Sequence, residues 1–258
     1  MRANSPRAYG RISVPMEGSV AQADPLTRIA FLRKVYALFG GAMALWMGTT
    51  YLVVTNEGLL SIATSFLGGG FLGLILLFAA MFFLLRLTSA RGTAVSLMGL
   101  GLFGVLEGFL TAPLVYMASM SQATSDALTS SEVQMLALTD TSNIVTQAFV
   151  LTCAVFGGLS AYALTTKRDF SWMRGALWMG FFALIGIAIL GYFGVGSGAM
   201  SWGYSAAFVI LMGGFVLYDT QNILRRYPEN MAATAAATLL IDFVIMFQHI
   251  LMLLMRRD

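Results

Sequence analysis

The sequence has few of the residues from which metal, disulfide and nucleotide sites are built. It contains one cysteine, Cys153, and one histidine, His249, which rules out an intrachain disulfide and argues against a Cys/His zinc site. No glycine-rich phosphate-binding loop follows a predicted strand, and no basic segment alternates with aromatic residues as in nucleic-acid-binding proteins. These absences argue against the commonest classes of soluble enzyme and against a nucleic-acid partner.

Charged residues are also scarce. They make up 10% of the chain, against about 25% in a typical soluble domain, while 58% of the residues are hydrophobic. The chain is therefore predicted to be an integral membrane protein in contact with the lipid bilayer. Because lipid offers no hydrogen bonds to the backbone, each span must be a helix, and the predicted fold class is an all-α bundle.

Seven hydrophobic stretches each have about the 20 residues that a helix needs to cross a bilayer. They predict a seven-helix transmembrane domain over residues 35–255, preceded by a basic N-terminal segment at residues 1–34. A cytoplasmic tail is the simpler interpretation of that segment, although its early arginines and late first acid, Glu17, are also found in transit peptides. The predicted spans are residues 35–54, 66–85, 94–118, 143–165, 173–194, 204–224 and 234–254.

The charge of the connecting segments alternates along the chain. The connections after the first, third and fifth spans contain no lysine or arginine, so the positive-inside rule places the N-terminus in the cytoplasm. The C-terminal tail is an exception, since Arg256 and Arg257 lie outside if the last segment crosses fully and inside if it is re-entrant. A full crossing is favoured because residues 234–254 contain no helix breaker. The basic residues that follow the second, fourth and sixth spans are Arg86, Arg91, Lys167, Arg168, Arg174, Arg225 and Arg226.

Two aspartates interrupt the last two hydrophobic stretches, Asp219 in FVLYDTQNIL and Asp242 in LLIDFVIMF. A linker of about nine residues makes these helices antiparallel neighbours, and each aspartate lies in the cytoplasmic half, so the two carboxyl groups are expected at the same depth. Two carboxyl groups in contact in a poorly solvated site cannot both ionise cheaply, so we expect them to share a proton near neutral pH. The alternative is that each bonds separately to a neighbouring hydroxyl or carbonyl group, or lies in a hydrated crevice.

A shared proton gives a short, strong hydrogen bond that can hold two helices together. Loss of that proton leaves two repelling charges, or two ligands for a hard cation such as Ca²⁺. The pair Asp219 and Asp242 is therefore expected to sense pH, and it is also a candidate Ca²⁺ site.

Three further ionisable groups lie within or beside the predicted spans. Glu107, near the middle of the third span, is either a carboxyl group on an ion pathway or a protonated acid bonded across the bundle. His249 follows Asp242 by seven residues and shares its helix face, so it extends a proton or ion route or is a neutral core residue. Arg86 either reaches back to the membrane interface or serves as a counter-charge to one of the aspartates.

Four segments of the chain have a distinctive sequence, namely FLRKVYALFGGAMAL, AFVLTCAVFGGLSAYALTTKRDFSWM, GGFVLYDTQNIL and LLIDFVIMF. They resemble the Bax inhibitor-1 (transmembrane Bax inhibitor motif) family, and most closely its bacterial members. The resemblance extends over most of residues 31–255.

The resemblance implies a seven-helix fold with the last helix central, a location in the bacterial inner membrane and a pH-dependent leak of Ca²⁺. It also implies that a paired-aspartate unit, here Asp219 and Asp242, acts as the pH sensor and latch. Some relatives use an acid and an arginine in the second span as well, but residues 66–85 contain no acid.

We therefore expect a pH-sensitive Ca²⁺ leak channel with no tightly bound cofactor, in which Ca²⁺ is the permeant ion. The alternative is a regulatory protein that binds other membrane proteins, such as a protease or a component of stress-induced cell death. A proton-coupled transporter is disfavoured because no paired broken helices are evident. An intramembrane aspartyl protease is disfavoured because Asp242 lacks a Gly-x-Gly-Asp context, so no enzymatic activity is expected.

Overall fold

All of the regular secondary structure is helical in the computed structural model, which describes residues 19–90, 92–128, 144–194 and 202–255. This confirms the predicted all-α fold class. The helices are α1 (Pro25–Thr55), α2 (Glu57–Leu67), α3 (Gly70–Thr88), α4 (Thr93–Leu128), α6 (Ile144–Thr165), α7 (Arg174–Tyr192), α8 (Trp202–Arg226) and α9 (Ala232–Leu254), with 3-10 turns η1 (Val20–Gln22), η2 (Ser171–Met173) and η4 (Glu229–Met231).

Six of the described helices are long and apolar enough to cross a membrane, namely α1, α4, α6, α7, α8 and α9. Helix α3 adds a shorter apolar segment, Leu76–Thr88. Parts of the predictions lie outside the described residues. They are the first 18 residues of the basic N-terminal segment, the tail arginines Arg256 and Arg257, and most of the connection between the third and fourth predicted spans.

The structure differs from the sequence prediction most clearly between residues 56 and 70. Asn56 lies in the predicted connection between the spans 35–54 and 66–85, but it ends α1 and starts α2, because its side-chain oxygen accepts a hydrogen bond from the backbone N–H of Leu59 at 3.1 Å. The predicted second span, 66–85, begins too early, since α2 ends at Leu67 and α3 starts at Gly70. The glycine run 68–70 separates them, because glycine is a poor helix former.

Helix α1 begins well before its predicted span. Asp24 caps it by accepting hydrogen bonds from the Thr27 hydroxyl and from the backbone N–H groups of Thr27 and Leu26. These bonds favour the charged form and lower the pKa of Asp24 from its ordinary value. Pro25 occupies the first helical position, where its missing N–H is not needed.

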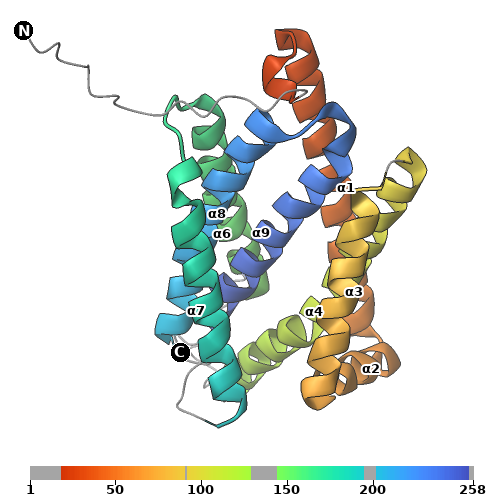
Figure 1. Ribbon diagram of the computed structural model, residues 1–258. Coiled ribbons are helices and arrows are strands. Elements are labelled where there is room, and N and C mark those ends of the chain that lie inside the picture. The colour runs from red at the N-terminus through yellow and green to blue at the C-terminus, as the bar shows by residue number, and fades with distance from the viewer. Residues whose placement is uncertain (1–18, 91, 129–143, 195–201, 256–258) are drawn as a thin grey trace, which may run out of the picture.

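Helix α9 is the most buried of the candidate spans. The buried share of its most apolar stretch is 61%, whereas that of α7 is 6%. It packs against α1, α3, α4, α6 and α8. In Figure 1 it runs obliquely between α6, α7 and α8 on one side and α1, α3 and α4 on the other. Among these candidate spans, α9 is therefore the most enclosed by other helices, and α7 leaves most of its surface exposed.

Two glycines bring α4 into backbone contact with α1. A methyl group added at Gly108 would lie 2.5 Å from the Trp46 carbonyl oxygen, and one at Gly104 would lie 2.8 Å from the Ala42 carbonyl oxygen. Small residues spaced four apart permit this close approach of membrane helices. The contact fixes α1 and α4 together on one side of α9.

Replacing Gly108 with alanine is expected to destabilise the protein, since overpacking of this kind costs about 1–3 kcal/mol. Gly157→Ala in α6 is the matched control, because nothing lies within 4 Å of its added methyl group. Thermal unfolding of the two variants in detergent should show a lower midpoint for Gly108→Ala alone. Equal midpoints would contradict the close α1–α4 contact.

Candidate functional site

Helices α8 and α9 form an antiparallel hairpin, with a short connection at residues 227–231 that includes η4. Pro228 starts this turn, and its carbonyl oxygen accepts a hydrogen bond from the Met231 N–H at 3.1 Å. The connection is shorter than the predicted linker because both helices extend further than their predicted spans. The hairpin keeps the aspartate of α8 next to that of α9.

Asp219 of α8 and Asp242 of α9 line one cavity of about 320 Å³. Asp242 is only 4% exposed, and its Oδ2 atom has no hydrogen-bond partner among the residues that the structure describes. Asp219 is half-buried and lines the same cavity from the adjoining helix. The structure thus brings together the two acids that the sequence singled out.

The walls of this carboxylate cavity are mainly apolar. The other polar groups that line it are the hydroxyls of Tyr227 and Thr238, which lie 3.4 Å apart. Burial raises the pKa of Tyr227 above its ordinary value, so its hydroxyl stays neutral at physiological pH. The apolar lining residues are Met81 of α3, Trp178 and Phe181 of α7, Met212 and Phe215 of α8, and Ile241 and Ile245 of α9.

The cavity offers few ligands to an inorganic cation. Ca²⁺ takes six to eight oxygen ligands, and this cavity supplies the carboxyl groups of Asp219 and Asp242 with two neighbouring hydroxyls. Among the described residues, no group of three or more His, Cys, Asp or Glu side chains could hold a metal ion. A Ca²⁺ ion at this place would keep much of its water shell.

The residues after Asp219 hold α8 to other parts of the chain. The Thr220 hydroxyl lies 3.4 Å from that of Ser160 in α6. Gln221 accepts a hydrogen bond from the Phe170 N–H at 2.8 Å and donates one to the Arg168 carbonyl oxygen at 2.6 Å. Successive positions on a helix differ by about 100°, so Asp219, Thr220 and Gln221 face three different neighbours.

The last turn of α8 strengthens its attachment to the connection between α6 and α7. Arg225 forms an ion pair with Asp169 at 3.4 Å, and Arg226 donates a hydrogen bond to the Ser171 hydroxyl at 3.1 Å. Both groups of the ion pair are partly exposed, so this pair contributes little by itself. The buried amide of Gln221 is the stronger attachment.

The N-terminal turn η1 also meets this region. The Val20 N–H donates a hydrogen bond to the Tyr227 carbonyl oxygen at 3.0 Å, and the Val20 side chain is buried. Tyr227 in turn lines the carboxylate cavity. The segment before α1 therefore packs against the turn that closes one end of the cavity.

Glu107 does not line the carboxylate cavity. It is buried on α4 beside Gly108, where α4 meets α1. One turn further along α4, the Thr111 hydroxyl accepts hydrogen bonds from Trp46 Nε1 at 3.1 Å and from Gln248 Nε2 at 3.0 Å. This network joins α1, α4 and α9, and the sequence analysis did not identify it.

His249 and Arg86 also lie apart from the aspartates. His249 is 8% exposed, and its ring centroid lies 4.1 Å from that of Phe208. Within the described part of the chain, neither of its ring nitrogens has a hydrogen-bond partner. Arg86 is exposed near the end of α3, and the interactions of the described residues include no ion pair between it and Asp219 or Asp242. Neither residue is among those that line the carboxylate cavity.

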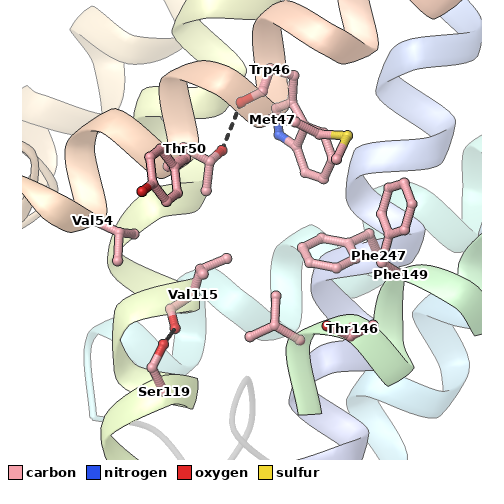
Figure 2. A pocket seen from close by; sticks show the side chains of 11 residues that line it. Trp46, Met47, Thr50, Val54, Val115, Ser119, Thr146, Phe149 and Phe247 are labelled. Carbon is pink, nitrogen blue, oxygen red and sulfur yellow. Dashed lines mark hydrogen bonds between the residues drawn. The ribbon is translucent and has the colours of Figure 1, made fainter. Parts of the chain in front are cut away.

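A second cavity, of about 470 Å³, lies between α1, α4, α6 and α9. Figure 2 shows Phe149 and Phe247 on one side of it and Val54 and Val115 on the other. Hydroxyls that line it donate to backbone carbonyl oxygens: Ser119 donates to Val115 at 2.7 Å, and Thr50 donates to Trp46 at 2.8 Å and to Gly108 of α4 at 3.1 Å. No carboxyl group lines this apolar cavity, which distinguishes it from the cavity of Asp219 and Asp242.

The apolar helices and the buried carboxyl pair define a helical integral membrane protein with an ionisable site between α8 and α9. A family model described as "Inhibitor of apoptosis-promoting Bax1" matches residues 28–258, and the chain belongs to this Bax inhibitor family.

Relatives from distant organisms agree with this assignment. The Golgi anti-apoptotic protein of vaccinia virus (strain Lister) is 30% identical over 92% of this chain and 89% of its own length. Protein lifeguard 4 of Mus musculus is 30% identical over 90% of this chain and 87% of its own length. The uncharacterized protein Cj0236c of Campylobacter jejuni is 38% identical, but the match covers 47% of this chain and 52% of that protein.

Replacing Gln221 with leucine is expected to destabilise the protein by about 1–3 kcal/mol, because the Phe170 N–H and the Arg168 carbonyl oxygen lose their partner. Hydrogen exchange at the Phe170 amide should also become faster. Asn222→Leu is the matched control, since the buried Oδ1 atom of Asn222 has no hydrogen-bond partner. Unchanged exchange at Phe170 in Gln221→Leu would argue against this attachment.

Proposed function

We propose that the protein is a pH-sensitive cation leak channel, with Ca²⁺ as the permeant ion and Asp219 and Asp242 as its pH sensor and latch. The observation that carries the proposal is the carboxyl group of Asp242. It is nearly fully buried, has an unpartnered oxygen and faces the same cavity as Asp219 on the adjoining helix. An ionisable group at membrane depth is costly and marks a functional site.

In the closed state, the two carboxyl groups share one proton. The shared proton gives a charge-assisted hydrogen bond between α8 and α9. Such a bond holds Asp219 against the most buried helix of the bundle, and it removes the cost of two adjacent charges. The apolar walls around the pair exclude water and so strengthen the bond.

Loss of the proton opens the latch. Two carboxylates in a cavity with few other polar groups repel each other strongly. Helix α9 is packed on five helices, whereas α7, which flanks α8, has little buried surface. The repulsion therefore moves α8, together with the α6–α7 connection that Gln221 holds, and leaves α9 in place. The separated carboxylates then attract a cation into the pathway.

We place the end of the bundle that carries this connection in the cytoplasm of a bacterium, with α9 at the centre of a bundle of seven membrane-spanning helices. Hydrogen bonds support this orientation by joining the basic connections at one end. Gln221 binds the Arg168 carbonyl oxygen, and Thr234 at the start of α9 donates to the Thr88 carbonyl oxygen at 3.0 Å, close to Arg86. A positively charged end of this kind faces the cytoplasm under the positive-inside rule.

The second candidate is a regulatory protein that binds other membrane proteins. Its support is the vaccinia virus relative, whose name describes an anti-apoptotic protein and which matches this chain along 92% of its length. The aromatic residues Trp172 and Phe182 around α7 are exposed and offer a surface for such contacts. In this reading, the aspartate pair controls the shape of the bundle and no ion passes through it.

Purified protein in liposomes is expected to release Ca²⁺ faster as the pH rises from about 6 to about 8, because the pair loses its shared proton in this range. The liposomes are loaded with Ca²⁺, and a Ca²⁺-sensitive dye in the external solution measures the flux. Tyr227, the other ionisable residue of the cavity, stays neutral and contributes nothing to this response.

The double variant Asp219→Asn plus Asp242→Asn is expected to lose the pH response, since it removes the titrating groups and keeps similar side-chain shapes. Asp24→Asn is the control, because it changes a carboxyl group outside the cavity and keeps a cap for α1. Wild-type flux no greater than that of empty liposomes would exclude the channel and favour the regulatory protein. A persistent pH response in the double variant would exclude the aspartates as its source.

A further inference from the structure

We infer that the carboxylate cavity is a binding site for a lipophilic ammonium ion, an organic cation with an apolar body. The inference rests on the proposed function in that it uses the same aspartates, but it assigns them a ligand that differs from the permeant ion. The cavity joins an unpartnered buried carboxyl oxygen of Asp242, the neighbouring carboxyl group of Asp219 and a wall of aromatic side chains.

The aromatic wall is built for contact with a cation. Trp178 and Phe181 of α7 both meet Phe215 of α8 edge to face, with ring centroids 6.0 and 6.1 Å apart. All three side chains line the cavity that contains the carboxyl groups. Aromatic faces attract ammonium groups, and sites for quaternary ammonium ligands use such faces.

The remaining wall fits the apolar body of the ligand. Met81, Met212, Ile241 and Ile245 line the cavity and offer no ligand to a metal ion. Methionine side chains adapt their shape to apolar partners. A hydrated metal ion would leave these surfaces unused, whereas an alkylammonium ion buries its chain against them and presents its charge to the aspartates.

The charges also match. A carboxyl pair that shares one proton carries a single negative charge, which one ammonium group neutralises. Trp178 is 45% exposed on the outer surface of α7 while it lines the cavity, so the wall is continuous with the surface that faces lipid. Figure 1 places α7 and α3, which supply opposite parts of this wall, on the two sides of α9. A cation dissolved at the membrane therefore reaches the site from the bilayer.

The larger cavity between α1, α4, α6 and α9 serves as an internal comparison. It has aromatic side chains, including Trp46, Phe149 and Phe247, but no carboxyl group lines it. It is expected to bind apolar molecules with no preference for a cation. Preference for a cation over a neutral molecule of the same shape therefore reports on the carboxylate cavity alone.

Calorimetric titration of n-octyltrimethylammonium into the purified protein in maltoside micelles tests the inference, with protein-free micelles as the blank. Its neutral tert-butyl analogue has the same shape without the charge, and we expect it to bind at least about tenfold more weakly. The double variant Asp219→Asn plus Asp242→Asn is expected to lose this preference. Ile241→Phe, which narrows the cavity and keeps both acids, is expected to weaken binding of the cation as well.

Two controls should leave the affinity for the cation unchanged. Val115→Phe narrows the apolar cavity, and Asp24→Asn removes a carboxyl group elsewhere. Equal binding of the cation and its neutral analogue, or full affinity in the double aspartate variant, would overturn the inference. Because the titration involves no ion flux, binding without Ca²⁺ release would leave this inference standing and remove the channel, and release without binding would do the opposite.

Discussion

The buried carboxyl group of Asp242 is the constraint on which the rest of the structure depends. It lies on the helix with the largest buried share, and one of its oxygens has no hydrogen-bond partner. A charge in such a place is tolerated only if it is neutralised by a proton, a cation or a partner. The position of α8 is therefore coupled to the protonation and occupancy of the cavity that Asp242 shares with Asp219.

The helices on the two sides of α9 are held with different strength. Gly104 and Gly108 allow α4 to touch the backbone of α1, and the Trp46–Thr111–Gln248 network ties both helices to α9. On the other side, hydrogen bonds from Gln221 and neighbouring arginines connect α8 to the α6–α7 connection. The first side is held by close backbone contact and buried bonds, whereas the second includes partly exposed groups that rearrange at lower cost.

Hydropathy predicted most of the fold because lipid imposes one rule on every span. It failed around Asn56, where a side-chain cap begins a second helix that is too short to cross a membrane, and at the glycine run before α3. The pairing of Asp219 with Asp242 was predictable because one stretch of sequence contains both helices and their short linker. The position of each aspartate in its hydrophobic stretch gives its depth in the membrane. The partners of Gln221 and Thr111 were not, since they lie 51 and 65 residues away in the chain and are joined only by folding.

The order Asp219-Thr220-Gln221 limits which sequence changes α8 can tolerate. Each residue faces a different neighbour: the carboxylate cavity, Ser160 of α6 and the Phe170 amide. Inserting or deleting one residue upstream in α8 would turn all three by about 100° and disconnect them at once. A substitution removes one of these contacts, whereas an insertion or deletion removes all three. The three contacts therefore depend on one helical register, and this part of α8 should tolerate substitutions more readily than insertions or deletions.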